Sequence, residues 1–164
     1  MMKKILFIST GGTFNKHYSP ETGEIAIDID ASTLTEIANK WRCDFEIVTI
    51  IGKDSLYMND QDRETLLETI KLSQIKNIIV IHGTDTMDLS AKVIADAALD
   101  KQVILTGAMI PYRVDKVEAT ANVAMAYGYL QGSPVSGVYI SMNGVIGDYT
   151  YIIKNRQKKR FELV

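Results

Sequence analysis

Three short polar segments hold the residue types on which catalysis usually depends. They are residues 10–13 (TGGT), 52–55 (GKDS) and 82–86 (HGTDT). The last of them places the Asp85 carboxylate between two threonine hydroxyls. A threonine hydroxyl is a weak nucleophile until a neighbouring base takes its proton, so threonine chemistry requires a carboxylate or an amine close by. The chain supplies both groups. A lysine about 4 Å from Asp85 would be attracted to it by roughly 4 kcal/mol at an effective dielectric constant near 20, which is enough to change the basicity of a catalytic group strongly.

Each of these segments also has an ordinary structural interpretation. The Gly11–Gly12 pair exposes backbone N–H groups that suit an oxyanion, but glycines after a strand more often serve a turn. Asp85 or Thr86 is equally suited to cap the helix that follows. His82 at a strand end is more often structural than catalytic, so we leave it out of the mechanism. The functional interpretation therefore rests on the combination of these groups and not on any one of them.

Composition sets the class of protein in which these groups must work. The 164 residues are 46% hydrophobic and 23% charged, which predicts one compact domain over residues 1–164. With 18 Lys and Arg against 20 Asp and Glu, the net charge of −2 offers no broad attraction for nucleic acid or an anionic membrane surface. We therefore expect neither as a partner.

The remaining composition argues against metals and export. Two His and a single Cys, Cys43, without HxxxH or CxxC spacing, predict no metal site and no internal disulfide. The apolar run at residues 5–8 is too short for a signal peptide, and no stretch approaches the roughly 20 apolar residues of a membrane span. We expect a cytoplasmic protein.

The elements that must position the polar segments alternate along the chain. Short apolar runs predict buried strands at residues 4–9, 45–51, 77–81, 103–105 and 138–141. Helical spacing of apolar residues lies between them, around residues 34–41, 66–70, 89–97 and 121–130. Helix-start signals precede two of these, Thr33 with Glu36 and Asn59 with Asp62.

This alternation predicts a three-layer α/β/α fold with a mainly parallel, Rossmann- or flavodoxin-like sheet. Ligands bind such sheets beyond the carboxyl ends of the strands. Because all three polar segments follow strands, we expect their loops to converge at that edge.

The motifs in these loops resemble those of the bacterial-type L-asparaginase family. TGGTF, KDSLYMND and HGTDTM occur in the family's order, and TGAMIP, SMNG and KNR continue it. The similarity covers nearly the whole chain but only the family's N-terminal domain. We therefore expect a single asparaginase N-terminal-type domain without the family's smaller C-terminal domain, which closes the neighbouring subunit's site.

The resemblance implies hydrolysis of a side-chain amide to acid and ammonia through an acyl-enzyme, without a cofactor. It implies that Thr13 is the nucleophile and that Thr84, Asp85 and Lys154 activate a hydroxyl or water. Without the resemblance, Lys154 would be read as a solvated lysine of a basic tail that includes Arg156 and Arg160.

The resemblance also implies substrate contacts. Ser55, Gly12, Gly83 and Asp85 would bind the substrate, with Asp85 meeting its α-amino group. Tyr18 would orient the nucleophile, and His17 is a less suitable alternative. Tyr57 departs from the family, which often has an acidic residue there, so the preference for an α-amino acid stays open.

Two functions follow from these observations. The first is an amidohydrolase acting on L-asparagine or a related small amide, such as a glutamine- or nicotinamide-type substrate, and working as a homo-oligomer. The alternative is a non-catalytic or regulatory module that binds an amino acid or amide. The stretch with Tyr149, Tyr151, Ile152 and Ile153 is either a self-association surface or a sixth strand or hairpin that covers the core.

Overall fold

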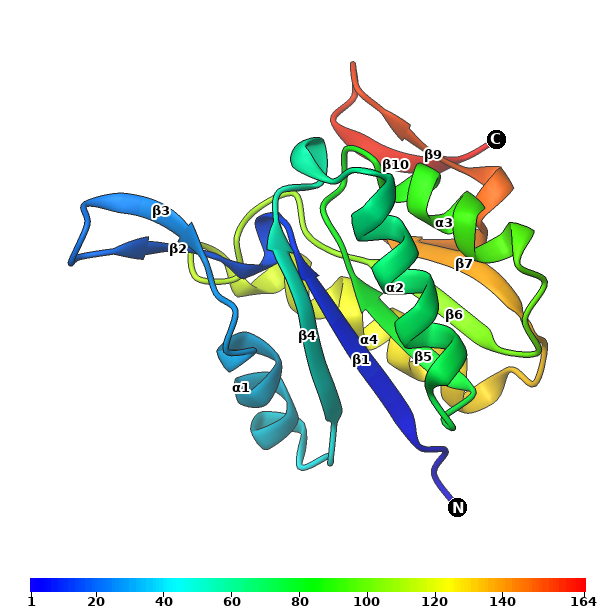
Figure 1. Ribbon diagram of the computed structural model, residues 1–164. Coiled ribbons are helices and arrows are strands. Elements are labelled where there is room, and N and C mark those ends of the chain that lie inside the picture. Colours follow the sequence, from blue (N-terminus) through cyan, green and yellow to red (C-terminus); the bar gives the residue numbers. More distant parts are fainter.

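A six-stranded sheet forms the centre of the computed structural model, which describes residues 1–164. The strand order is β4-β1-β5-β6-β7-β8 (Figure 1). The first five strands are parallel, and β8 runs antiparallel to β7. The strands are β1 (Ile5–Gly11), β4 (Glu46–Lys53), β5 (Asn77–Ile81), β6 (Gln102–Thr106), β7 (Gly137–Met142) and β8 (Val145–Asp148). All five predicted strands are present, with ends that differ by a few residues.

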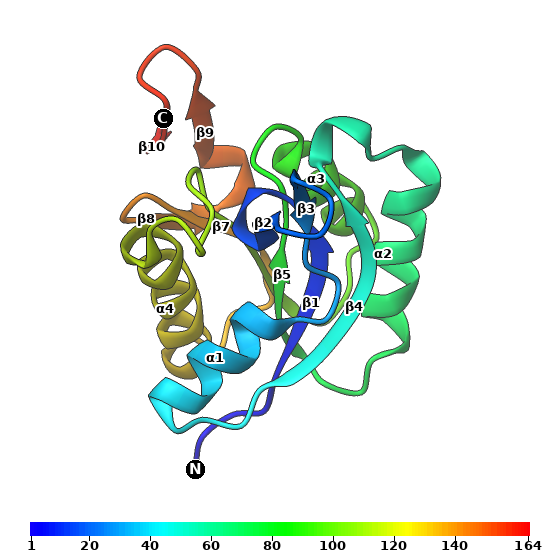
Figure 2. The same cartoon turned by 90° about the vertical axis from the view of Figure 1, so that its left-hand side faces the viewer.

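Two helices cover each face of the sheet, as Figure 2 shows edge-on. They are α1 (Ser32–Trp41), α2 (Asp60–Leu72), α3 (Met87–Asp96) and α4 (Lys116–Gly132). Alternate residues of a strand face opposite sides, so Ile78 and Val80 pack with α2 and α3, while Ile79 and Ile81 pack with α1 and α4. This arrangement confirms the predicted three-layer α/β/α fold.

One of the two predicted helix-start signals was wrong. The Asn59 side chain accepts the Asp62 N–H at 3.0 Å and the Asp62 carboxylate accepts the Asn59 N–H at 3.0 Å, so α2 begins with the expected capping box. Helix α1 instead begins at Ser32 without a side-chain cap. Thr33 is buried there, and Glu36 pairs with two cations from the β6–α4 region, Arg113 and Lys116.

Two hairpins extend beyond the sheet at the carboxyl ends of its strands (Figure 1). They pair β2 (Lys16–Ser19) with β3 (Glu24–Ile27), and β9 (Ile152–Asn155) with β10 (Arg160–Leu163). The second hairpin buries Ile152 and Phe161 in the core beside α3. Of the interpretations offered for the aromatic stretch, the structure thus contains the hairpin that covers the core.

The short 3-10 turns η1 (Thr13–Asn15) and η2 (Ser55–Tyr57) follow strands at this edge, whereas η3 (Tyr149–Tyr151) connects β8 to β9 beside α3. None of the helices has the length and apolar character needed to cross a membrane.

Candidate active site

The three polar loops meet at the carboxyl ends of β1, β4 and β5. The Gly12 N–H donates to the Lys53 carbonyl at 2.9 Å. A Cβ atom at Gly12, where φ is +80°, would lie 2.5 Å from the Gly83 nitrogen. A Cβ atom at Gly83 would lie 2.6 Å from the Ser55 Oγ atom. The backbones therefore approach so closely that only glycine fits at both positions, and the predicted convergence of the loops is confirmed.

Lys154 joins this edge from the far end of the chain. Its Nζ atom donates to Thr84 Oγ1 at 2.8 Å and to Asp85 Oδ1 at 2.7 Å. Side chains alternate along a strand, so Lys154 of β9 points to the same side as the buried Ile152. Only 15% of the Lys154 side chain and 28% of the Asp85 side chain are exposed. The hydrogen bond from Lys154 is the main cause that lowers the pKa of Asp85 below its ordinary value.

Arg156 provides a second cation for the same carboxylate. Its Nη1 atom donates to Asp85 Oδ1 at 2.8 Å and its Nη2 atom to the Asp85 carbonyl at 3.1 Å. The Arg156 side chain is 65% exposed. The sequence alone assigns this residue only to a basic tail. Arg156 directly follows β9, two positions after Lys154, and this spacing could have identified it, because alternate residues of an extended chain point to the same side.

Ser55 is fully buried between these loops and holds the start of the HGTDT segment in place. Its Oγ atom accepts the Asp85 N–H at 3.2 Å, and its carbonyl accepts the Thr86 hydroxyl at 2.9 Å. Arg63 of α2 also donates to the Thr86 hydroxyl, at 3.2 Å. Thr86 therefore makes no side-chain cap at the start of α3, although the sequence allowed that interpretation.

A second carboxylate lies beside the first. Asp54 accepts a hydrogen bond from Lys16 of β2 at 2.7 Å and caps η2 through the Leu56 N–H at 3.1 Å. Burial raises the pKa of Asp54, but the hydrogen bonds outweigh it and the pKa lies below its ordinary value. Asp54 and Asp85 are thus both already paired with lysine.

Thr13 opens η1, directly after the glycine that packs on Gly83. Its side chain is half-buried, and its hydroxyl makes no hydrogen bond to the Thr84–Asp85–Lys154 group. Since the Gly12 N–H is bound to Lys53, Gly12 contributes to this site as a close backbone contact and not as a free donor.

Tyr18 lies in the projecting β2–β3 hairpin, outside the cluster. It is opposite Ile25, and its side chain is 61% exposed. His17, opposite Ala26, is half-buried in the same hairpin. The structure therefore brings together Thr84, Asp85, Lys154 and Ser55, but neither Tyr18 nor His17.

His82 is a structural residue, as expected. It is completely buried, with Nδ1 2.7 Å from the Gly83 carbonyl and Nε2 2.7 Å from the Ser90 hydroxyl. Burial lowers its pKa to about 4, so the ring is neutral at pH 7.

A network of amide side chains anchors the hairpin that carries Lys154. The Asn143 Oδ1 atom accepts the N–H of Phe161 at 2.9 Å, and Phe161 is the residue opposite Lys154. Asn122 of α4 in turn accepts the Asn143 N–H at 2.9 Å and donates to the Gly107 carbonyl at 3.0 Å. Gly107 belongs to the TGAMIP motif and Asn143 to the SMNG motif, for which the sequence suggested no role. Both motifs thus help to fix the position of the β9–β10 hairpin and of Lys154 within it.

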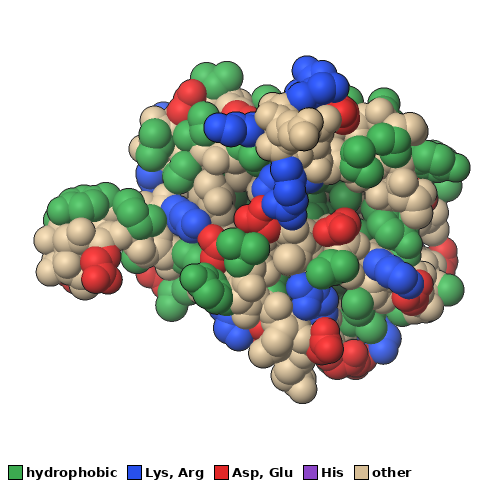
Figure 3. All heavy atoms as spheres, turned by 90° about the horizontal axis from the view of Figure 1, so that it is seen from above, with side chains coloured by type: hydrophobic (Ala, Val, Ile, Leu, Met, Phe, Trp, Pro, Cys, Tyr) green, Lys and Arg blue, Asp and Glu red, His purple; other side chains and the backbone are tan.

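Figure 3 looks onto this edge of the sheet, where Lys and Arg side chains lie next to Asp and Glu side chains near the middle of the face. A cleft of about 400 Å³ between α3 and β9 is lined by Thr84, Asp85, Leu89, Lys154 and Arg156, among others. No three His, Cys, Asp or Glu side chains gather in a group that could hold a metal ion.

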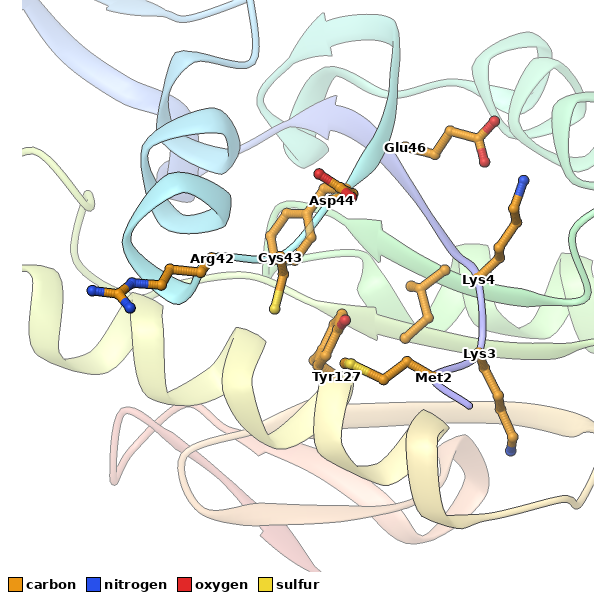
Figure 4. A pocket seen from close by; sticks show the side chains of 10 residues that line it. Met2, Lys3, Lys4, Arg42, Cys43, Asp44, Glu46 and Tyr127 are labelled. Carbon is orange, nitrogen blue, oxygen red and sulfur yellow. The ribbon is translucent and has the colours of Figure 1, made fainter.

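Another cavity, of about 530 Å³, lies at the opposite edge of the sheet (Figure 4). It is lined by residues at the start of β1 and β4 and by Tyr127 of α4. None of the predicted site residues lines it, so it is separate from the polar cluster.

Comparisons with known proteins show the family of the chain. The family model described as "Asparaginase, N-terminal" matches residues 4–161. L-asparaginase 1 of Escherichia coli K12 is 26% identical over 95% of this chain and 46% of its own length. A subunit of the glutamyl-tRNA(Gln) amidotransferase of Aeropyrum pernix is 28% identical over 94% of this chain and 38% of its own length.

Solved structures share the fold. The thermostable L-asparaginase from Thermococcus kodakarensis superposes with a TM-score of 0.82 at 22% identity, covering 98% of this chain and 51% of that one. A probable cytoplasmic L-asparaginase from Campylobacter jejuni gives a TM-score of 0.79 at 26% identity, covering 98% and 53%. The chain thus spans about half the length of these relatives, or less. It belongs to the asparaginase family, in which it corresponds to the N-terminal domain.

Proposed function

We propose that the protein is an amidohydrolase that converts the side-chain amide of L-asparagine, or of a related small amide, to the acid and ammonia. The observation that carries this proposal is the position of Lys154 Nζ, 2.8 Å from the Thr84 hydroxyl and 2.7 Å from the Asp85 carboxylate. These residues are about 70 positions apart in sequence. A hydroxyl, a carboxylate and an amine held in contact at the ligand-binding edge of an α/β sheet are the groups that threonine chemistry requires.

In the proposed reaction Thr13 is the nucleophile. Its oxygen bonds to the amide carbon, the carbon–nitrogen bond breaks, and the hydroxyl proton passes to the nitrogen, which leaves as ammonia. Water then attacks the acyl-enzyme. Its oxygen bonds to the carbonyl carbon, the bond to Thr13 breaks, and a proton returns to the Thr13 oxygen.

Thr84, Asp85 and Lys154 move the protons in both steps. As an amine, Lys154 accepts the proton of a hydroxyl or of water, and as an ammonium it is held by Asp85. General-base assistance of this kind typically contributes about 10²- to 10⁴-fold in rate. Backbone N–H groups of the turn at Thr13 or of the Thr84 region would stabilise the oxyanion, each by roughly 3 kcal/mol. We propose no cofactor for these steps.

Ser55 and Gly83 shape the substrate site, and Asp85 lies at its charged end. We further propose that the protein works as a homo-oligomer with a contact near Tyr149–Tyr151, and that it is cytoplasmic, as the Campylobacter jejuni relative is described. Light scattering that gives only a monomer at high protein concentration would exclude the oligomer.

Ammonia release from a panel of amides tests the activity. L-asparagine, L-glutamine and nicotinamide are incubated with the wild-type protein and with Thr13→Ala. We expect release from at least one amide by the wild type and its loss in the variant. If L-aspartate binds tightly but no amide is hydrolysed, the protein is a binding module, and the proposal is wrong.

A further inference from the structure

Asn15 is a buried polar residue at the end of the η1 turn, two positions after the proposed nucleophile Thr13. Only 1% of its surface is exposed. Its Nδ2 atom donates to Ser9 Oγ at 3.0 Å and to the Gly11 carbonyl at 3.2 Å. Its backbone N–H donates to the Gly12 carbonyl at 3.2 Å. Asn15 therefore connects the last residue of the turn to the end of β1, and Thr13 lies between them.

These hydrogen bonds fix the two peptide planes that precede Thr13. In the first plane, the Gly11 carbonyl is bound by the Asn15 amide and the N–H of the next residue by the Lys53 carbonyl, at 2.9 Å. In the second plane, the Gly12 carbonyl is bound by the Asn15 N–H. Glycines with φ of +108° and +80° have the freest backbone of any residue type, so only outside contacts hold their direction. Because a trans peptide is planar, these contacts set the direction in which the chain enters Thr13.

The partners of the Asn15 side chain determine how its amide is oriented. A carbonyl only accepts, so the atom next to the Gly11 carbonyl is the Nδ2 donor. The Oδ1 atom is then buried without a hydrogen-bond partner. A buried acceptor without a partner costs free energy, so the two donor bonds explain the amide at this position and the filling of space does not. The backbone of Asn15 is fixed as well, since its carbonyl accepts the Asp28 N–H at 2.8 Å.

From these contacts we infer that Asn15 is a positioning residue, which holds the glycine turn so that the Thr13 hydroxyl is presented at the carboxyl edge of the sheet. The inference rests on the proposed amidohydrolase function and adds a residue to its machinery. Because Asn15 is almost fully buried, it acts through Thr13 and not on the substrate. A displacement of about 1 Å can lower a rate roughly 10²-fold, so loss of the Asn15 amide should mainly lower kcat. Ser55 lies in another loop, so substrate binding there should change little.

The experiment measures ammonia release by the wild type, Asn15→Leu and Asn15→Asp, with the amide that the wild type hydrolyses best. Leucine has a similar volume but no donor. An ionised carboxylate has the shape of the amide but only acceptors, and protonation restores one O–H donor. The control is Thr106→Val at the end of β6, two strands away from β1. It removes another buried side-chain donor, whose bond to the Ser141 carbonyl is 2.7 Å long.

We expect Asn15→Leu to lower kcat by about 10- to 100-fold and to change KM by less than about threefold. The kcat of Asn15→Asp relative to the wild type should rise by about tenfold or more as the pH is lowered from 8 to 5, because burial next to oxygen acceptors raises the pKa of the introduced carboxyl. The relative kcat of Asn15→Leu should not depend on pH, and Thr106→Val should keep kcat within about threefold of the wild type. Wild-type kcat in Asn15→Leu, or a relative kcat of Asn15→Asp that does not change with pH, would overturn the inference.

Hydrogen exchange of the Gly12 amide separates this inference from the hydrolysis itself. The Gly12 N–H is bound to the Lys53 carbonyl, so we expect it to be protected in the wild type. In Asn15→Leu its protection should fall by about tenfold or more relative to the amides of β5. If the wild type hydrolyses no amide but this loss occurs, the proposed hydrolysis is wrong and the role of Asn15 in the turn stands. If the Gly12 amide is equally protected in both proteins, the inference is wrong.

Discussion

Replacing Lys154 by methionine should destabilise the protein in a pH-dependent manner. Methionine keeps most of the side-chain volume but removes the cation bound to Asp85 and Thr84. Hydrogen bonds to charged groups contribute roughly 1.5–3 kcal/mol, and fully exposed ion pairs contribute about 0–1 kcal/mol. The Lys154 and Asp85 side chains are 15% and 28% exposed, so the contribution of this pair should lie between these two energies. We therefore expect Lys154→Met to lower the free energy of unfolding at pH 7 by about 1–2 kcal/mol.

The sign of the pH dependence follows from Asp85. Its pKa is lowered in the folded protein, chiefly by the hydrogen bond from Lys154. The pair therefore adds stability above the unfolded pKa of about 3.9, and this stability is lost as the pH falls toward the lower folded value. The difference between wild type and Lys154→Met should narrow as the pH is lowered from 6 to 3.

Urea unfolding of both proteins at several pH values measures this difference. Lys158→Met is the matched control, because Lys158 belongs to the same hairpin and forms only an exposed pair with Glu162. We expect a much smaller loss for the control. A loss for Lys154→Met that equals the control, or that is the same at pH 6 and pH 3, would refute the assignment of Asp85 as its partner.

Three further predictions concern the positioning of the site. Gly83→Ala places a Cβ atom 2.6 Å from Ser55 Oγ and should lower the free energy of unfolding, measured in urea, by about 1–3 kcal/mol. The control Gly128→Ala lies in α4 with open space around it and should raise the free energy of unfolding by up to about 1 kcal/mol. Equal effects of the two substitutions would contradict the close approach of the loops. Asn143→Ala removes the acceptor of the Phe161 N–H and should lower the free energy of unfolding by about 1–2 kcal/mol and also lower the rate of ammonia release. An unchanged rate would exclude a role of Asn143 in positioning Lys154. His82 should titrate near pH 4 by NMR, so the protein should lose stability as the pH falls from about 6.5 to 4, and titration near pH 6.5 would show that the ring is not buried.

The sheet and the loops at its carboxyl edge were predictable from local patterns. Apolar runs such as residues 77–81 pack on both faces, which is a property of the sequence itself. The convergence of TGGT, GKDS and HGTDT then follows from parallel topology, since each segment ends a parallel strand. Lys154 was predictable only through the family resemblance, because its own segment indicates no more than a basic tail that includes Arg156 and Arg160.

Other features depend on tertiary contacts that local patterns do not encode. Arg156 was missed because its only link in the sequence to Asp85, 71 residues earlier, is its position two residues after Lys154. The helix-start signal at Thr33 and Glu36 was wrong because α1 already begins at Ser32, and Glu36 pairs with Arg113 and with Lys116 at the start of α4. The first hairpin was not predicted, since its two strands have four residues each and no buried side chain, whereas the second was predicted only as one of the interpretations of the aromatic stretch.

The most direct test of the central claim is a double-variant cycle on ammonia release, using whichever amide the wild type hydrolyses best. Thr13→Ala and Lys154→Met should each lower kcat by about 10²-fold or more, and the double variant should lose little beyond the worse single variant, because groups that act as one unit are not additive. Wild-type rates in Lys154→Met, or losses that multiply in the double variant, would contradict the claim that the hydroxyl, the carboxylate and the amine work together.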